Sequence, residues 1–281
     1  MSSSAAYKQA GKSSTIHDTV TNTKVDHAAV MKAFKDPTQA LRDRIARRIA
    51  THVRDIECPT CVDVGCAIGG DCQTLMRALS RKANVTGVDI MEAQVKVARE
   101  RVPECTFVQG GAEKLPFADS SVDSIQCARL LIHVPKLQSA LAEFLRVMKP
   151  GAIGVFYEGD FRTNKLLTTN AVIAKVHAAK MDLTTSGLAH PNIATDVLKY
   201  LIASPSAANV TIDGFPSVVR DPTYGLPVVK EMDAKKLTKL VEMGTLTQKE
   251  VDTYWKELDA AVQSGDWVET ALLFEISFIK K

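Results

Sequence analysis

Between residues 60 and 160, short apolar runs alternate with segments of helical periodicity. In the helical segments apolar residues recur every three or four positions, as Leu137, Leu141, Phe144 and Met148 do, which is the spacing of one helix face. The apolar runs predict strands at 61–64, 85–89, 105–108, 122–128 and 152–158. Because parallel strands are joined by crossover helices, the alternation predicts a parallel sheet with helices on both faces.

The flanking segments follow other patterns. Residues 1–37 are rich in Ser, Thr and Lys without a sustained period, and we expect a flexible arm or a lid that orders with a ligand. A helix is expected from Asp36–Pro37 onward. Later helices are expected at 166–181, 193–203, 233–243 and 247–262, and later strands at 210–212 and 269–279. We therefore expect one α/β domain over 38–281, with helical insertions at about 162–205 and 225–265 that cover a substrate pocket.

Composition excludes several functional classes. The 281 residues carry 35 basic and 32 acidic side chains, mixed along the chain, for a net charge of +3, so no nucleic-acid partner is expected. No apolar run reaches the roughly 18 residues that a membrane span needs, and the polar start lacks the apolar stretch of a signal peptide. Three of the six cysteines fall in or beside predicted buried strands. Reduced thiols in a cytoplasmic enzyme are therefore expected.

The strongest local motif is VDVGCAIGG at residues 62–70, a strand that runs into a glycine-rich turn and then a helix. A ligand at the carboxyl end of a parallel sheet must approach the backbone there, and only small residues permit that approach. A tight strand-to-helix turn without a ligand also uses glycine. The motif alone leaves both interpretations open.

A second signal is Asp89, which ends the next strand in VTGVDI. An acidic side chain at this place can accept both ribose hydroxyl protons of a nucleoside. It can also cap the helix expected from Met91 onward. The two roles are compatible.

Taken together and in order, VDVGCAIGG, VTGVDI, GGAEKLPFADSSVDSI, ARLLIHV and EFLRVMKPGA resemble the class I S-adenosylmethionine-dependent methyltransferases, near their ubiquinone/menaquinone-type small-molecule branch. The resemblance covers about residues 40–160, and beyond residue 160 it extends only to general layout. It implies a Rossmann-like seven-stranded sheet, six strands parallel and the last antiparallel, with S-adenosylmethionine across the carboxyl ends of the first strands and S-adenosylhomocysteine as product. It also implies methyl transfer to oxygen or carbon, less readily to nitrogen, of a small-molecule acceptor.

The resemblance also implies which residues bind the cofactor. The methionine end is expected to contact Asp63, Gly65, Cys66 and Gly69. The ribose and one face of the adenine are expected to contact Asp89 and Ile90, and Ala112 and Glu113 are expected beside the adenine. The site is expected to be closed beneath the sulfonium by Cys127 to Arg129. Three positions depart from the family pattern. Ala67 and Ala152 stand where glycine is usual, and Gly111 stands where an Asp usually accepts from the adenine amino group. The adenine contact is then expected to shift to Glu113.

Methyl transfer is a displacement at a sulfonium methyl, so most of its acceleration can come from holding nucleophile, carbon and sulfur in line. A general base is needed only for a hydroxyl or an acidic carbon. His133, expected at the start of the helix after the fourth strand, is the candidate base, although it could equally be structural. Arg129 could bind a carboxylate or phenolate, or form a surface ion pair. Glu158 and Asp160 follow the fifth strand and are candidate substrate contacts.

Other classes remain as alternatives. A dinucleotide oxidoreductase would explain the spacing of Gly65, Ala67 and Gly70, but it has no need of Asp63 or of the segment 113–117. A cofactor-binding regulatory protein without turnover stays open, and so does an RNA or protein methyltransferase, which the balanced charge disfavours. Cys58 and Cys61 have a zinc-like spacing, yet no second pair follows at a metal-site spacing, so no metal is expected.

Overall fold

The computed structural model describes residues 15–18, 23–26, 38–80, 82–223 and 227–281. Eight strands form one mixed sheet in the order β5-β4-β3-β6-β7-β10-β8, and β9 pairs with the other edge of β10. The strands are β3 (Thr60–Val64), β4 (Asn84–Asp89), β5 (Thr106–Gln109), β6 (Val122–Ala128), β7 (Met148–Gly159), β8 (Lys165–Leu167), β9 (Ala207–Val219) and β10 (Val268–Lys280). The neighbours from β5 to β7 are parallel, and β10 is antiparallel to β7, β8 and β9.

Two helical layers cover the two faces of the sheet. Helices α3 (Gln39–His52), α4 (Gly70–Leu79) and α5 (Glu92–Arg101) share one core with Cys61 and Val155. Helices α6 (Leu137–Val147) and α8 (Ile193–Ala203) share the other core with Val62 and Phe156. Successive strand residues thus point into opposite cores, which is why these strands are apolar throughout rather than alternating.

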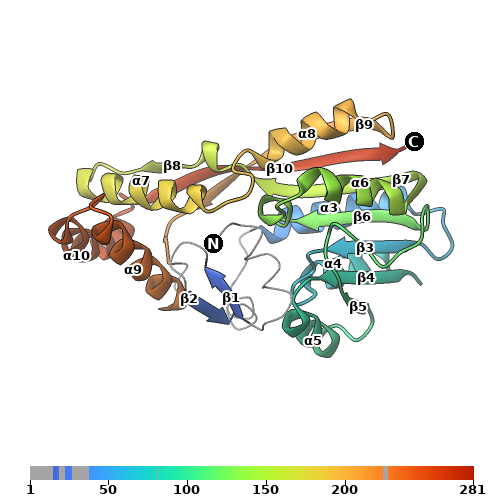
Figure 1. Ribbon diagram of the computed structural model, residues 1–281, viewed down its shortest axis with the longest axis horizontal. Coiled ribbons are helices and arrows are strands. Elements are labelled where there is room, and N and C mark those ends of the chain that lie inside the picture. The colour runs from blue at the N-terminus through green and yellow to red at the C-terminus, as the bar shows by residue number, and fades with distance from the viewer. Residues whose placement is uncertain (1–14, 19–22, 27–37, 81, 224–226) are drawn as a thin grey trace.

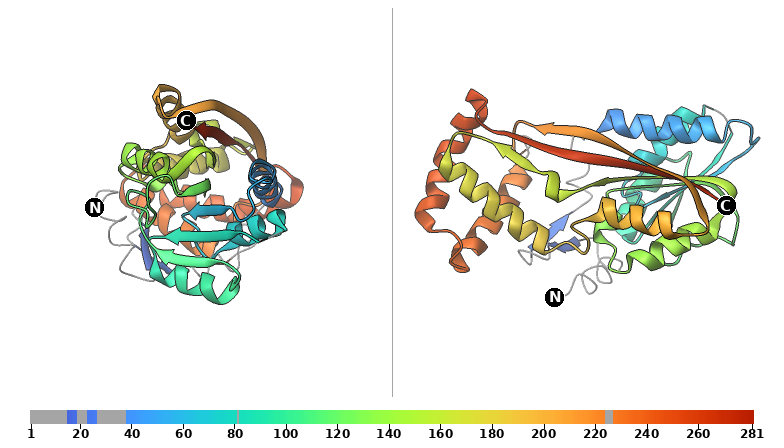
Figure 2. Two further views of the ribbon diagram at one scale, coloured as in Figure 1. Left: turned by 90° about the vertical axis from the view of Figure 1, so that its right-hand side faces the viewer. Right: turned by 90° about the horizontal axis from the view of Figure 1, so that it is seen from above.

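A third core lies in a separate helical lobe, made of α7 (Ala171–Ser186), α9 (Pro227–Glu242) and α10 (Gln248–Ser264). The long β9–β10 ribbon connects this lobe to the sheet, since β10 pairs with β8 at one end and with β7 further on. In Figure 1 β10 runs to the right, so the carboxyl ends of the parallel strands face the lobe on the left. The two further views in Figure 2 show the lobe beyond the end of the sheet.

Part of the amino-terminal arm is described. Strands β1 (Thr15–Asp18) and β2 (Thr23–Asp26) form an antiparallel pair, which Figure 1 shows between α9 and the carboxyl ends of the parallel strands. The rest of the arm predicted as a lid, and the expected helix start at Asp36–Pro37, lie outside the described residues.

The predicted Rossmann-like α/β sheet with an antiparallel last strand is confirmed, but its strand number is not. The sheet has eight strands, and seven of them share one direction, rather than seven and six. The additional strand β8 lies at the start of the segment 166–181 that was expected to be helical, and α7 begins only at Ala171. There Asn170 caps the helix by accepting from the N–H groups of Val172 and Ile173.

Helix α10 begins with a capping box, in which Thr247 and Glu250 each accept from the other's N–H. Within the part of the chain that the structure describes, no helix is both long enough and apolar enough to cross a membrane.

Candidate cofactor and active site

The glycine turn between β3 and α4 needs glycine at two positions. Gly65 and Gly69 have φ angles of +78° and +83°, in the left-handed region that favours glycine. A Cβ at Gly65 would lie 3.0 Å from the Cβ of Leu130, and one at Gly69 would lie 2.8 Å from Cζ of Phe107. The Gly65 N–H donates to the carbonyl of Val88 at 2.7 Å. The turn is therefore held close against the end of β4.

Asp89 connects the end of β4 to that turn. Its side chain is buried, with Oδ2 accepting from the N–H of Ala67 and Oδ1 from the N–H of Met91, both at 2.9 Å. Burial raises the pKa of Asp89, and these backbone donors oppose that rise. Met91, not Asp89, is the N-cap of α5. A carboxylate has about four acceptor sites, and the N–H groups of Ala67, Met91 and Ile90 act on it, which leaves acceptor capacity for a ribose hydroxyl.

The departure at Ala67 has a visible structural consequence. Ala67 adopts a φ of +47°, which an alanine takes up at a cost of roughly 1–2 kcal/mol. The hydrogen bond from its N–H to Asp89 helps to hold this conformation. The turn thus keeps its shape without the glycine that the family usually has there.

Asp63 lies beneath the turn and is almost fully buried. Its Oδ2 lies 3.4 Å from the thiol of Cys72. Burial, and then the nearby charge of Asp71, raise the pKa of Asp63 to about 8. Asp71 in the first turn of α4 pairs with Arg42 of α3. The sequence interpretation missed Arg42, because only the packing of α3 on α4 brings it to the turn.

The residues predicted near the adenine follow the carboxyl ends of β4 and β5. Ala112 is buried and Ile90 is half-buried. The side chain of Gln109 donates to the carbonyl of Ile90 at 3.0 Å, joining the two strand ends. Glu113 lies 3.8 Å from the ammonium of Lys136. Gly111 leaves no side chain in this turn, in line with the expected shift of the contact to Glu113, which stays a prediction.

The end of β6 forms the floor of the candidate site. Cys127 is buried, and Arg129 has a φ of +54° with its N–H donating to the carbonyl of Tyr157 at 2.7 Å. Glu158 of β7 is fully buried, and its Oε1 accepts from the N–H of Leu131 at 2.7 Å. Burial raises the pKa of Glu158 to about 8. Glu158 therefore stabilises the turn that follows β6 through this hydrogen bond. Its contact with a substrate stays a prediction.

The structure places the other predicted polar residues at the surface or in ion pairs. His133 is exposed and ends the one-turn helix η1 (Leu131–His133). The expectation that it starts the next helix is wrong, because α6 begins only at Leu137. Asp160 precedes the one-turn helix η2 (Phe161–Thr163) and pairs with Arg162. The roles of His133 as a base and of Asp160 as a substrate contact stay predictions.

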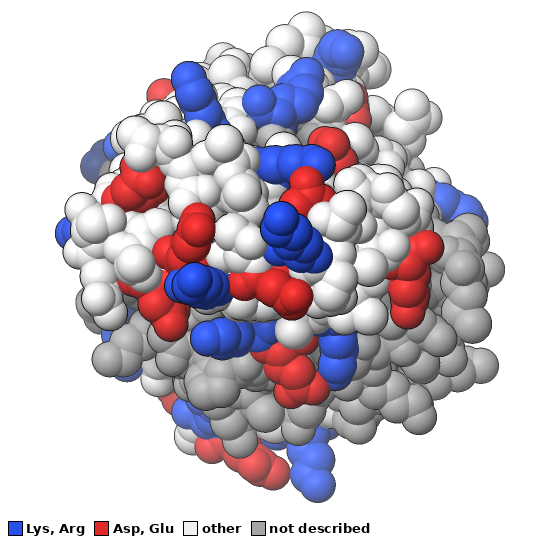
Figure 3. Space-filling model, turned by 90° about the vertical axis from the view of Figure 1, so that its left-hand side faces the viewer, with Lys and Arg blue, Asp and Glu red and all other residues white. Residues whose placement is uncertain are grey.

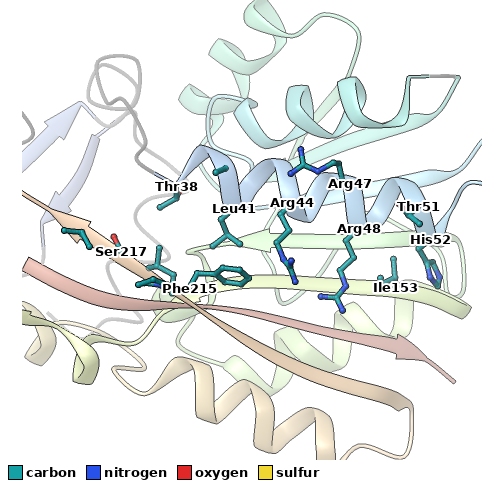
Figure 4. Close-up of a pocket in the computed structure, with 14 residues that line it drawn as sticks. Thr38, Leu41, Arg44, Arg47, Arg48, Thr51, His52, Ile153, Phe215 and Ser217 are labelled. Carbon is teal, nitrogen blue, oxygen red and sulfur yellow. The ribbon is translucent and has the colours of Figure 1, made fainter.

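A different hollow, a groove of about 910 Å³, lies between α3 and β9 (Figure 4). Arg44 and Arg48 point from α3 toward the β9–β10 ribbon and pair with Glu275, which is fully buried. Arg44 also lies over the Phe215 ring, 5.0 Å from its centre. The groove extends toward Gly151 near the amino end of β7. Its charges serve to hold α3 on the ribbon, at a distance from the carboxyl ends of the strands.

All six cysteines are free thiols. Among the residues that the structure describes, no cluster of three or more His, Cys, Asp and Glu side chains could hold a metal ion.

Comparison with known proteins agrees with this geometry. Residues 62–156 match the model of a methyltransferase domain family. The chain is 35% identical over 136 residues to a phthiotriol/phenolphthiotriol dimycocerosates methyltransferase of Mycobacterium tuberculosis, covering 48% of each protein. It is 39% identical over 105 residues to 24-methylenesterol C-methyltransferase 2 of Arabidopsis thaliana, covering 34% of this chain and 28% of the relative. The YcgJ protein of Bacillus subtilis shares the fold, with a TM-score of 0.53 at 15% identity over 83% of this chain and 97% of that one.

The family match is thus confined to residues 62–156, and the likeness to the YcgJ protein is one of fold. The chain spans about half the length, or less, of the curated relatives it matches. The names of these relatives do not single out the ubiquinone/menaquinone branch that the motifs resemble.

Proposed function

We propose that the chain is an S-adenosylmethionine-dependent methyltransferase that methylates oxygen or carbon, and less readily nitrogen, of a small molecule. The observation that carries the proposal is the position of Asp89. This buried carboxylate ends β4 and is hydrogen-bonded to the glycine turn of β3, so that an acid and a turn of small residues lie side by side. A nucleoside needs both: the acid for its sugar and the small residues for its close approach.

The residues present fit the cofactor. At Gly65 and Gly69 a Cβ would meet Leu130 and Phe107, so these positions need glycine for the turn to keep this close-packed shape beside Asp63 and Asp89. Asp63 and the turn would hold that end, Asp89 the ribose, and Ala112 with Glu113 the adenine. When bound, S-adenosylmethionine supplies an electrophilic methyl group on a positively charged sulfur.

The protein's own contribution is mainly orientation. The floor formed by Cys127 to Arg129 is held by the backbone bond from Arg129 to Tyr157 and by Glu158, so it does not have to reorganise when the acceptor arrives. Holding acceptor and methyl group in line can supply several orders of magnitude in rate. His133 would take a proton only from a hydroxyl or an acidic carbon, since other acceptors lose none before the displacement.

Two observations support a small acceptor over RNA. The mycobacterial and plant relatives are methyltransferases of a lipid and of a sterol. On the end of the helical lobe, Lys and Arg are interspersed with Asp and Glu rather than gathered into a basic face (Figure 3). A polyanion would need such a face for most of its binding energy.

The proposal is tested by isothermal titration of the whole chain with S-adenosylmethionine and, separately, with NADH. Saturable binding of S-adenosylmethionine alone is expected. Tight binding of NADH instead would mean a dinucleotide enzyme. Transfer of a tritiated methyl group to the small-molecule fraction of a cell extract is then measured with the wild type and His133→Ala. Cofactor binding without transfer to any acceptor would favour the regulatory protein.

A further inference from the structure

A second groove, of about 760 Å³, lies between α7 on one side and η2 with β8 on the other. We call it the α7 groove. Its apolar lining consists of Phe161, Leu166, Ala174, Ala178, Met181 and Pro191. Ala174 and Ala178 are exposed on the outer stripe of α7, and their small side chains leave the groove open. The rest of the lining is polar, with Arg162, Asn164, Lys165, His177, Asp182, Thr185 and Ser186, so the groove suits a molecule with both an apolar body and a polar group.

The floor of the α7 groove contains a buried imidazole. His177 is 8% exposed and lines the groove. Its ring makes no hydrogen bond to the described part of the chain; Oε1 of Glu269 lies 4.0 Å from Nε2, too far for one. That carboxylate accepts from the amide of Asn164 at 2.9 Å. The His177 side chain is 10% exposed, so water in the groove can hydrogen-bond to the ring, and the hydroxyl group of a ligand could take the place of that water.

The charges around the groove cancel. Burial lowers the pKa of His177 to about 4, so the ring is neutral at pH 7 and offers one donor and one acceptor. Burial also raises the pKa of Glu269. At the rim, Lys165 and Asp182 have opposite charges, and Arg162 is held by Asp160. Nothing in this arrangement selects an ion, whereas an uncharged hydroxyl group would satisfy the ring.

One wall of the α7 groove is close in the fold to the candidate active site. Phe161, which lines the groove, lies two residues beyond the end of β7, the strand that pairs with β6. Phe161 and Leu130 pack against the same hydrophobic core. Leu130 in turn fills the space beside Gly65 in the glycine turn. The same hydrophobic core therefore supports both the cofactor turn and the wall of the groove at Phe161.

We propose that the α7 groove binds the methyl acceptor, an uncharged amphiphile whose apolar body lies along α7 and whose hydroxyl group hydrogen-bonds to His177. The identity of this ligand as the methyl acceptor rests on the proposed function, whereas its binding in the α7 groove does not. His177 is in this account a binding residue that selects for a hydroxyl.

The probe for this proposal is para-pentylphenol, with its methyl ether as the matched ligand that lacks the donor. The whole chain, labelled with ¹³C at its methionine methyl groups, is titrated with each, and the Met181 signal is assigned through Met181→Leu. The phenol is expected to shift the Met181 signal and to bind about five- to tenfold more tightly than the ether, the worth of about one net hydrogen bond.

Two variants locate the binding. Ala178→Trp fills the groove and is expected to abolish the Met181 shift, whereas Ala260→Trp, at an exposed position on α10, should leave it unchanged. His177→Phe should bind phenol and ether equally. The proposal is overturned if the phenol leaves Met181 unshifted, if it binds Ala178→Trp as well as the wild type, or if the preference for phenol survives in His177→Phe.

Titration of the same variants with S-adenosylmethionine separates this proposal from the proposed function. Ala178→Trp and His177→Phe should bind the cofactor as the wild type does, because both positions lie outside the glycine turn. If the wild type fails to bind the cofactor but the phenol still shifts Met181, the proposed function fails and the groove remains a ligand site.

Discussion

Replacing Glu158 by glutamine should change how stability depends on pH. Glu158 is fully buried, its Oε1 accepts from the N–H of Leu131, and burial raises its pKa from 4.5 to about 8. Between these two pH values the folded protein holds a proton that the unfolded chain has released. The free energy of unfolding therefore falls as pH rises, by about 1.4 kcal/mol per pH unit from this residue alone. The full contribution is present below the unfolded pKa and is lost as pH rises through the folded one.

Glutamine has the same shape and no charge, and its side-chain oxygen can still accept from Leu131. The advantage of Glu158→Gln over the wild type should therefore grow by roughly 3 kcal/mol between about pH 5.5 and about pH 7.5. Urea unfolding at three pH values measures it, with Glu100→Gln at an exposed position on α5 as the control. Asp63 titrates in both proteins, so its effect cancels in the difference. Parallel pH dependences for Glu158→Gln and the wild type would refute the reasoning.

Three further substitutions test the turn and the helical lobe. Ala67→Gly should raise the free energy of unfolding by up to about 1 kcal/mol, because it relieves a φ of +47° and this gain exceeds the entropic cost of introducing a glycine. A loss of stability in urea would contradict this. Gly69→Ala should lower it by about 2 kcal/mol or more, since the new Cβ would lie 2.8 Å from Phe107 in a left-handed conformation; wild-type stability would contradict the clash. Lys180→Met should cost about 3–5 kcal/mol by leaving the carboxylate of Asp233 buried and unpaired, and adding Asp233→Leu should recover most of that loss. A thermodynamic cycle that shows no coupling between the two positions would count against the pairing.

The positions of the central strands and their parallel arrangement could be predicted because their signal is local. In β3 the residues Val62 and Val64 point into one core and Cys61 into the other, so the strand is apolar throughout. The same holds for β7, where Val155 and Phe156 face opposite cores. Such strands are buried on both faces, which is typical of a parallel sheet.

Strands β8 and β9 could not be predicted fully, because their pairing depends on distant residues. β8 has three residues, and its partner is the segment 268–270 of β10, about a hundred positions away. β9 was expected only at 210–212, although it extends from Ala207 to Val219. Gly214 and Pro216 interrupt its pattern, and proline is tolerated there because β9 is an edge strand.

In the candidate site too, some contacts could be predicted from the sequence and others could not. The glycine turn and Asp89 lie in one continuous βαβ segment, so their proximity follows from the chain order. Arg42 reaches the turn only through the packing of α3, and Glu158 reaches Leu131 only across two neighbouring strands. No pattern near these residues in the sequence indicates either contact. His177 likewise appears as an ordinary helix residue until α7 is placed beside β8.

The claim that a nucleoside is held by the acid at the end of β4 is tested most directly with Asp89→Asn. The amide keeps an oxygen for only one of the two backbone donors, Ala67 or Met91, and removes the charge and one of the two acceptor oxygens, so affinity for S-adenosylmethionine should fall by about ten- to a hundredfold. Isothermal titration of this variant, with the exposed Asp55→Asn as control and thermal unfolding to confirm that both are folded, gives the answer. An unchanged dissociation constant in a folded Asp89→Asn protein would contradict the placement of the cofactor.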